Sequence, residues 1–294
     1  MIDTKQIPAL IHLMDDPDEQ IFTHVRDQLL DCGSSIIPIL ENSWSNTDLG
    51  LLFQDRMAEL IHDIQFKEIQ INLQNWMNSD DKDLIEGAYL LAKYQFPDLN
   101  KAQIVKEIET IKQTIWLELN DHQTIFEKIQ IFNHVFYEIF AFKGNIKNYH
   151  APKNSFINEV LTYKKGNPLS LSIIYSYIGQ QLGLPLYGVN LPNHFIVACM
   201  DESNLQQYVP QKNNFGVLFY INCFSKGTIL DFNEIEKYLK EANLENDRMY
   251  FEPCSNSQIM IRMCSNLIFS YQEIGNLNKV NELKLLKSIL SSAI

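Results

Sequence analysis

The chain has 294 residues, of which 46% are hydrophobic and 20% charged, so it is long enough to bury a large core in one or two domains. This composition excludes collagen, coiled coil and intrinsic disorder. The net charge of -12 disfavours binding to a nucleic-acid backbone. The sequence has no signal-like N-terminus and no run of about 20 apolar residues, which predicts a cytoplasmic protein that does not bind membranes.

The cysteines and histidines show no ligand spacing. The five cysteines stand at positions 32, 199, 223, 254 and 264 without a CxxC pair, and the seven histidines are scattered. Structural zinc sites and disulfide scaffolds both need closer or paired spacing. We therefore expect free thiols, no metal and no cofactor. The one concentrated basic pair, Lys164–Lys165, is expected in a solvated loop.

Residues 1–120 show apolar positions at helical period, interrupted by short polar turns. The segments MDDPDEQIFTHVRDQLLDCG and MNSDDKDLIEGAYLLAKYQFP each place an acidic turn before an amphipathic helix, beginning at Ile21 and Leu84. A helix over 51–64 would be a middle copy. This spacing resembles an α-solenoid of the HEAT type, and an irregular helical bundle remains the alternative.

The three tryptophans of the chain, Trp44, Trp76 and Trp116, fall in this helical region. They could anchor a partner. A tryptophan on an apolar helix face is more often part of the core, which is the interpretation we favour.

The pattern changes after a predicted helix over 122–142. Asn167 can cap a helix that has Pro168 in its first position and an apolar stripe that ends before Gly183 and Pro185. Strands are predicted over 186–191 and 194–200. A third, over 217–224, follows a 16-residue polar connection.

A helix followed by antiparallel strands, with a histidine at the start of one strand and Asn222 in the next, is the order of a papain-like or transglutaminase-like core. The runs NSFINEVL, KKGNPLSLSIIY, QQLGLPLYGVNLPNHFIVA and INCFSKGTIL closely resemble the transglutaminase-like domain of the SirB family, over roughly residues 115 to 250. The resemblance implies an α+β fold, and family members often carry further helices or tetratricopeptide-like repeats.

By this resemblance, His194 falls on the catalytic histidine of the superfamily, Asn222 on its aspartate and Pro168 on its cysteine. Proline has no thiol, so the nucleophile is missing and the triad is degenerate. Asn167, Ser170 and Asn193 are the expected neighbours of this cleft. An asparagine can still orient a histidine, so the loss of the cysteine is what puts activity in doubt.

No other residue replaces the cysteine by sequence geometry. Ser170 lies about 200° around the helix from Pro168, and Ser172 lies about 6 Å deeper. Ser170 is expected to satisfy an amide of the first helical turn. Cys199 and Cys223 should point away from His194 and Asn222, because alternate residues of a strand face opposite sides.

The chain returns to helix after residue 252, with a break at Gly275–Asn276 that predicts a helical hairpin resembling one tetratricopeptide-like unit. Its methionines, Met260 and Met263, are expected in the core. The predicted fold class is α+β and mostly helical. Its predicted parts are a HEAT-like region over 1–120, a transglutaminase-like core with a small antiparallel sheet over 121–252, and a helical tail over 253–294.

Two functions follow. The favoured one is a non-catalytic pseudo-enzyme that binds a protein or peptide, without nucleic acid or membrane. The alternative is a hydrolase or acyl transferase that uses His194 and Asn222 with an unidentified nucleophile or with water. His194 itself has two interpretations: it contacts a ligand in the cleft, or it is a structural residue hydrogen-bonded to Asn222.

Overall fold

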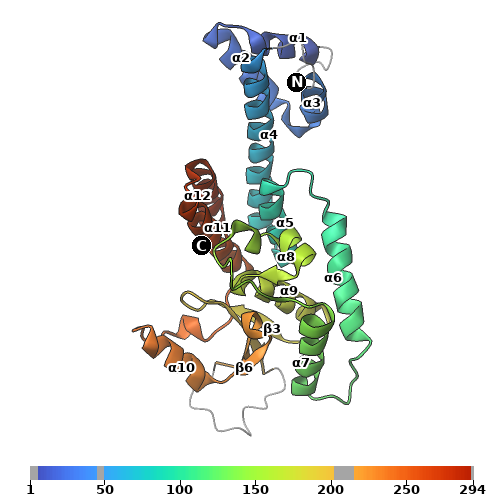
Figure 1. The fold of residues 1–294 in the computed structure, drawn as a ribbon, viewed down its shortest axis with the longest axis vertical. Coiled ribbons are helices and arrows are strands. Elements are labelled where there is room, and N and C mark those ends of the chain that lie inside the picture. The colour runs from blue at the N-terminus through green and yellow to red at the C-terminus, as the bar shows by residue number, and fades with distance from the viewer. Residues whose placement is uncertain (1–5, 45–49, 202–214, 293–294) are drawn as a thin grey trace. The chain divides into compact units, whose positions relative to one another are not determined.

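The structure is a computed structural model that describes residues 6–44, 50–201 and 215–292 (Figure 1). Contacts along the chain divide it into two compact units, Met1–Asn75 and Trp76–Ile294, and the boundary falls inside one long helix. The α+β, mostly helical fold class is confirmed, since twelve α-helices and one four-stranded antiparallel sheet occur in the described ranges. The expected domain boundaries at residues 120 and 252 stay a prediction.

The first unit is helical. Its helices are α1 (Ile7–His12), α2 (Glu19–Asp31), α3 (Ile37–Trp44) and α4 (Leu51–Asn78), which crosses the unit boundary. Asp18 caps α2 by accepting a hydrogen bond from the backbone N–H of Gln20. The buried Arg56 of α4 donates to the carbonyl oxygens of Met14 and Asp16, which ties the turn before α2 to α4. The sequence predicted α4 only as far as residue 64, but no glycine or proline interrupts it before the polar turn at 78.

The second unit begins with α5 (Leu84–Gln95) and α6 (Lys101–Trp116). The helix predicted over 122–142 is shorter and less regular. Thr124 and Glu127 form a capping box that starts α7 (Ile125–Asn133), a π-helical turn follows over His134–Ile139, and the left-handed Ala141 stops it. The tryptophan prediction holds for Trp76, which is buried, and is wrong for two others: Trp44 is 41% exposed and Trp116 is 65% exposed.

Two helices and a two-residue parallel ladder precede the sheet. Strands β1 (Lys143–Gly144) and β2 (Lys165–Gly166) pair side by side, with Lys143 opposite Lys165. Helix α8 (Ile157–Tyr163) lies between them in sequence, and α9 (Pro168–Gln181) follows β2 at once. Helix α9 is almost wholly buried, which makes it the central element of the unit.

The sheet has the order β3 (Leu186–Val189), β4 (Ile196–Met200), β5 (Val217–Asn222) and β6 (Thr228–Leu230). Strand β4 begins two residues later than predicted. The chain turns at Asn193, whose φ is +55°, so His194 lies in the turn before the strand. Most of the polar connection predicted between β4 and β5 lies outside the described residues. Helix α9 packs on this sheet, where the absence of a side chain at Gly179 makes room for Leu186.

The chain ends in helices. After α10 (Phe232–Glu241), the hairpin of α11 (Asn256–Glu273) and α12 (Leu277–Ser291) forms as predicted, with the left-handed Gly275 at the turn. Ser255 and Gln258 form a capping box that starts α11. Met260 and Met263 are buried, which confirms their place in the core.

One contact holds the β5–β6 turn to the helices beneath it. The side-chain amide of Asn133 donates to the carbonyl oxygen of Gly227 at 3.0 Å, and its oxygen accepts from the hydroxyl of Tyr175 at 2.8 Å. Gly227 has φ +72°, and a Cβ atom added there would overlap the Asn133 side chain. Gly183 has the same φ of +72° but no heavy atom within 4 Å of an added Cβ.

These two glycines form a matched pair for a stability test. We expect Gly183→Ala to lower the free energy of unfolding by about 1 kcal/mol, from backbone strain alone. Gly227→Ala should lower it by about 3 kcal/mol, because it also breaks the contact with Asn133. Urea unfolding followed by tryptophan fluorescence in a Trp44→Phe background reports on the second unit. Equal losses in the two variants would contradict the role of Asn133.

Candidate functional site

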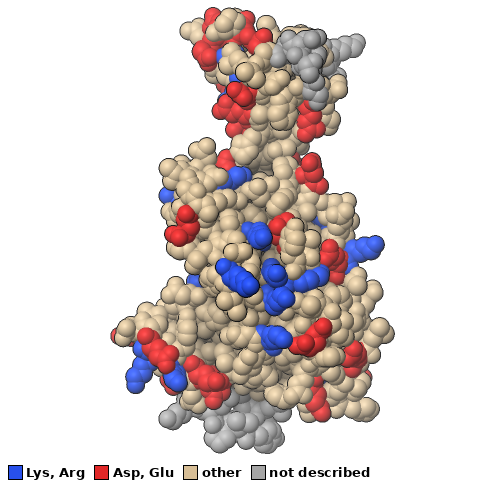
Figure 2. Space-filling model, viewed as in Figure 1, with Lys and Arg blue, Asp and Glu red and all other residues tan. Residues whose placement is uncertain are grey.

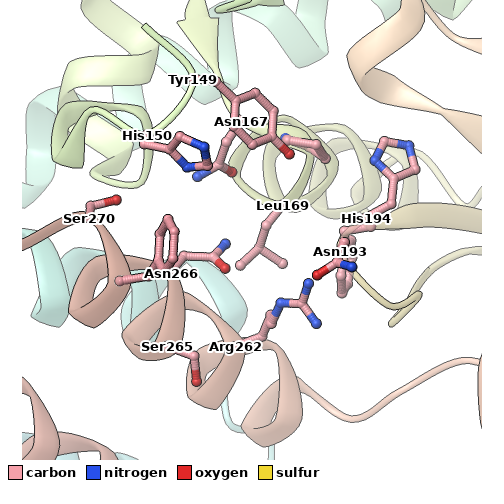
Figure 3. A pocket seen from close by; sticks show the side chains of 13 residues that line it. Tyr149, His150, Asn167, Leu169, Asn193, His194, Arg262, Ser265, Asn266 and Ser270 are labelled. Atoms are coloured by element: carbon pink, nitrogen blue, oxygen red, sulfur yellow. The ribbon is translucent and has the colours of Figure 1, made fainter. Parts of the chain in front are cut away.

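An open pocket of about 530 Å³ lies where four segments of the second unit meet (Figure 3). The segments are the loop before α8, the N-terminus of α9, the turn before β4 and one face of α11. The lining residues are Tyr149, His150, Asn167, Pro168, Leu169, Asn193, His194, Phe195, Arg262, Ser265, Asn266, Phe269 and Ser270. Its volume lies within the range of small-ligand sites, roughly 300–1,000 Å³.

The N-terminus of α9 forms one wall of this pocket. The Asn167 side chain accepts from the backbone N–H of Ser170 at 2.9 Å, and the Ser170 hydroxyl accepts from the backbone N–H of Asn167 at 3.1 Å. The same hydroxyl donates to the carbonyl oxygen of Asn154 at 2.6 Å. Ser170 is therefore buried in a structural role that the sequence predicted, and it is not among the residues that line the pocket.

His194 lies at one end of the pocket, in the turn that precedes β4. Burial lowers the pKa of His194, and its hydrogen bond with Asn222 raises it by less. The imidazole is therefore neutral at neutral pH. Asn222 does not line the pocket. Its side-chain oxygen accepts from the backbone N–H groups of Phe224 and Ser225 at 3.1 and 3.2 Å, which fixes the end of β5.

Helix α11 supplies the far wall. In Figure 3 the guanidinium of Arg262 and the amide of Asn266 point into the cavity, and Tyr149 and His150 lie across from them. The hydroxyl of Ser265 donates to the carbonyl oxygen of Ile261 at 2.9 Å. The pocket thus combines one fixed charge, several amides and the apolar side chains of its walls.

Comparison with known proteins assigns the chain to a family. The model of a family described as the transglutaminase-like superfamily matches residues 102–265, which is more than half of the chain and includes every lining residue except Asn266, Phe269 and Ser270. The chain belongs to the transglutaminase-like superfamily. No solved structure matches it.

The curated relatives of this superfamily member fall in two groups. A UPF0162 protein of Xylella fastidiosa is 25% identical over 190 residues, which cover 63% of both chains. A UPF0162 protein of Vibrio cholerae is 30% identical over 119 residues, 40% of this chain and 44% of that protein. The mouse F-box only protein 21 is 27% identical over 190 residues, 64% of this chain and only 27% of that protein. The matched regions thus cover less than two thirds of each of these relatives.

A transglutaminase-like enzyme of the cysteine type needs a thiolate in its cleft. All five cysteines are free, and none lines the pocket. Cys199, Cys223 and Cys264 are buried, and burial raises the pKa of Cys223, Cys254 and Cys264 to about 12. The thiols of Cys223, Cys254 and Cys264 therefore stay protonated at neutral pH and are poor nucleophiles. Ser172 is also fully buried.

Sequence reasoning missed the half of the pocket that comes from α11 and from Tyr149 and His150. Arg262, Asn266 and Phe269 stand four and three residues apart, so they share one helix face, but nothing local in the sequence points that face at His194. The described residues hold no group of three or more His, Cys, Asp or Glu suited to a metal ion. Over the same ranges, no helix is long and apolar enough to cross a bilayer.

The hydrogen bond between His194 and Asn222 can be tested through the pKa of His194. We expect Asn222→Asp to raise the pKa of His194, because a carboxylate next to the ring favours its charged form. The new side chain can still accept from the N–H groups of Phe224 and Ser225. The check is a pH titration of the imidazole carbon-bound protons by NMR, with His194→Gln identifying the signal. A His194 pKa that stays the same or falls would contradict the contact.

Proposed function

We propose that this protein is a non-catalytic transglutaminase-like protein that binds a segment of a protein or peptide in the pocket between α9 and α11. The observation that carries the proposal is an open pocket bordered by both Pro168 and His194. By the SirB-type resemblance, these residues stand at the positions of the catalytic cysteine and histidine. The ligand cleft is retained in this interpretation, and the nucleophile is not.

The missing thiol argues against covalent catalysis. Removing the nucleophile of a catalytic triad costs about a millionfold in turnover. The two serines that line the pocket do not replace it, since Ser265 bonds to the backbone of its own helix and Ser270 is buried. Neither of these two serines is therefore a nucleophile activated by His194.

The lining of the pocket suits a peptide. Asn193 and Asn266 each offer an amide donor and an amide acceptor, as a peptide backbone does, whereas the side chain of Asn167 is bonded to Ser170 and Ser155. Leu169 and Phe269 offer apolar contacts for side chains. Binding sites of this kind combine apolar walls with a few polar groups that orient the ligand.

The finer assignments belong to the same proposal. We propose a SirB-type core over 121–252, a HEAT-like helical region over 1–120 and a tetratricopeptide-like tail over 253–294. The five free thiols support a reducing compartment, which fits the proposed cytoplasmic location.

A second candidate function rests on one observation. His194 lines the pocket, is held by Asn222 and has a lowered pKa, so it is a neutral base that could activate water. The protein would then be a hydrolase of the same fold without a covalent intermediate. This alternative predicts that the wild-type protein hydrolyses a substrate and that His194→Gln does not.

A blocked-pocket variant tests the binding function. Asn266→Trp would fill the cavity, because the Asn266 side chain points into it (Figure 3). Gln272→Trp adds the same side chain at an exposed position of the same helix and is the matched control. Each protein is screened against a bead library of random heptapeptides with free carboxyl ends. We expect the wild type and Gln272→Trp to select a shared peptide motif and Asn266→Trp to select none.

The same proteins are screened for amidase, esterase and transglutaminase turnover. The proposal expects no turnover that depends on His194. If wild-type protein and Asn266→Trp select peptides equally, the pocket is not the binding site and the proposal is wrong. Turnover that His194→Gln removes would replace it with the hydrolase.

A further inference from the structure

The four arginines of the chain all lie in described residues, and they differ in one respect. Arg26 pairs with Asp63 at 2.5 Å, Arg56 with Glu19 at 2.8 Å and Arg248 with Glu252 at 2.6 Å. Arg262 has no carboxylate partner within the described part of the chain. Its guanidinium donates to the side-chain oxygen of Asn190 at 3.1 Å, which leaves most of its five N–H donors for other acceptors.

The surroundings of Arg262 do not neutralise it. The ionisable groups that act on its charge most strongly are Tyr149, Tyr238 and Cys254. Burial raises the pKa of all three, so each is neutral at neutral pH. Burial also lowers the pKa of Arg262 itself, which reflects the cost of holding this charge away from water. A half-buried arginine without an anion is an incomplete arrangement.

The charge of the neighbouring chain points in the same direction. Residues 139–200, which include most of the other pocket walls, carry five lysines against a single acidic residue, Glu159, in a chain whose net charge is -12. Basic side chains gather over the region of α8 and α9 on the face drawn in Figure 2. Lys143 and Lys165 are exposed neighbours in the β1–β2 ladder. This segment would attract an anionic ligand and repel a cationic one.

We infer that Arg262 is the anchor of a carboxylate-binding site in this pocket. The inference deepens the proposed function and rests on it, because the carboxylate would belong to the bound peptide, as its C-terminus or as an Asp or Glu side chain. The planar guanidinium can donate hydrogen bonds to both oxygens of a carboxylate at once, in a bidentate contact. The amide of Asn266, one turn along α11, points into the same cavity and can donate to the same group.

A carboxylate fits better than a phosphate. Arg262 is the one permanently charged side chain among the described residues that line the pocket, and His194 is neutral at neutral pH. One fixed positive charge balances a monoanion, whereas a phosphate dianion would need more. The N-terminus of α9, which also borders the pocket, adds the positive end of a helix dipole.

The contact with Asn190 gives Arg262 a structural role as well, since it joins α11 to the segment that follows β3. The test must separate the two roles. Arg262→Gln keeps a donor on this side chain and removes the charge. Arg248→Gln removes the same charge from an exposed arginine and is the matched control for net charge. Thermal unfolding of both variants reports any loss of structure.

The first measurement uses small probes and does not require a peptide. The side-chain Nε–H signal of Arg262 is identified by its absence in Arg262→Gln and is followed by NMR. N-acetylglycine, which carries a carboxylate, should shift this signal, and N-acetylglycinamide should not. Inorganic phosphate should shift it only at higher concentration. No shift with N-acetylglycine, or a stronger response to phosphate, would overturn the inference.

The second measurement uses the peptides selected by the wild-type protein, each also made with its C-terminus amidated and, separately, with Asp and Glu changed to Asn and Gln. We expect one of these changes to raise Kd about tenfold or more. The form that loses affinity identifies the source of the carboxylate. The difference should vanish in Arg262→Gln and persist in Arg248→Gln.

The outcomes separate the two proposals. If every neutral form binds within twofold of its parent while Asn266→Trp abolishes binding, the peptide site stands and the role of Arg262 is wrong. If no peptide is selected but N-acetylglycine shifts the Arg262 signal, the carboxylate site stands for small acids and the peptide function is wrong.

Discussion

The position of the pocket depends on how helix α9 begins. Asn167 and Ser170 satisfy each other's backbone N–H groups, and Ser170 also donates to the carbonyl oxygen of Asn154. A second hydrogen bond joins the side chain of Asn167 to Ser155 at 2.9 Å. These contacts are buried, so each would cost free energy if left unpaired. They hold Pro168 at the pocket wall. The rest of α9 packs against the sheet, in which strand β4 follows directly after the turn that holds His194.

The arrangement of charge follows from this architecture. The pocket is built from segments with few acidic residues, together with one arginine from α11 that no carboxylate in the described chain balances. A protein with an excess of 12 negative charges can still bind an anion there, because salt screens the effect of exposed charges that lie more than a Debye length from the site. The net charge therefore describes the whole surface and not this site.

Local signals in the sequence are enough to predict helix α9 and the turn between α11 and α12. The cap at Asn167, the proline in the first turn and the break at Gly275 are short-range features with clear physical causes. The start of β4 was misplaced because the left-handed backbone at Asn193 is a matter of tertiary context, and asparagine does not require that conformation. The α11 wall could not be predicted, since Arg262 and His194 are 68 positions apart in the numbering and no pattern links them.

Pro168 affects which amino-acid replacements at this position are favourable during evolution. A proline in the first helical turn loses no hydrogen bond, because that N–H has no partner within the helix, and its fixed φ favours the start of the helix. Under the proposed correspondence, a thiol and this proline compete for one position. A single replacement would remove the chemistry and stiffen the helix start at the same time. Return to a cysteine would then forfeit some folding stability before any activity was regained, so the exchange is easier in one direction than in the other.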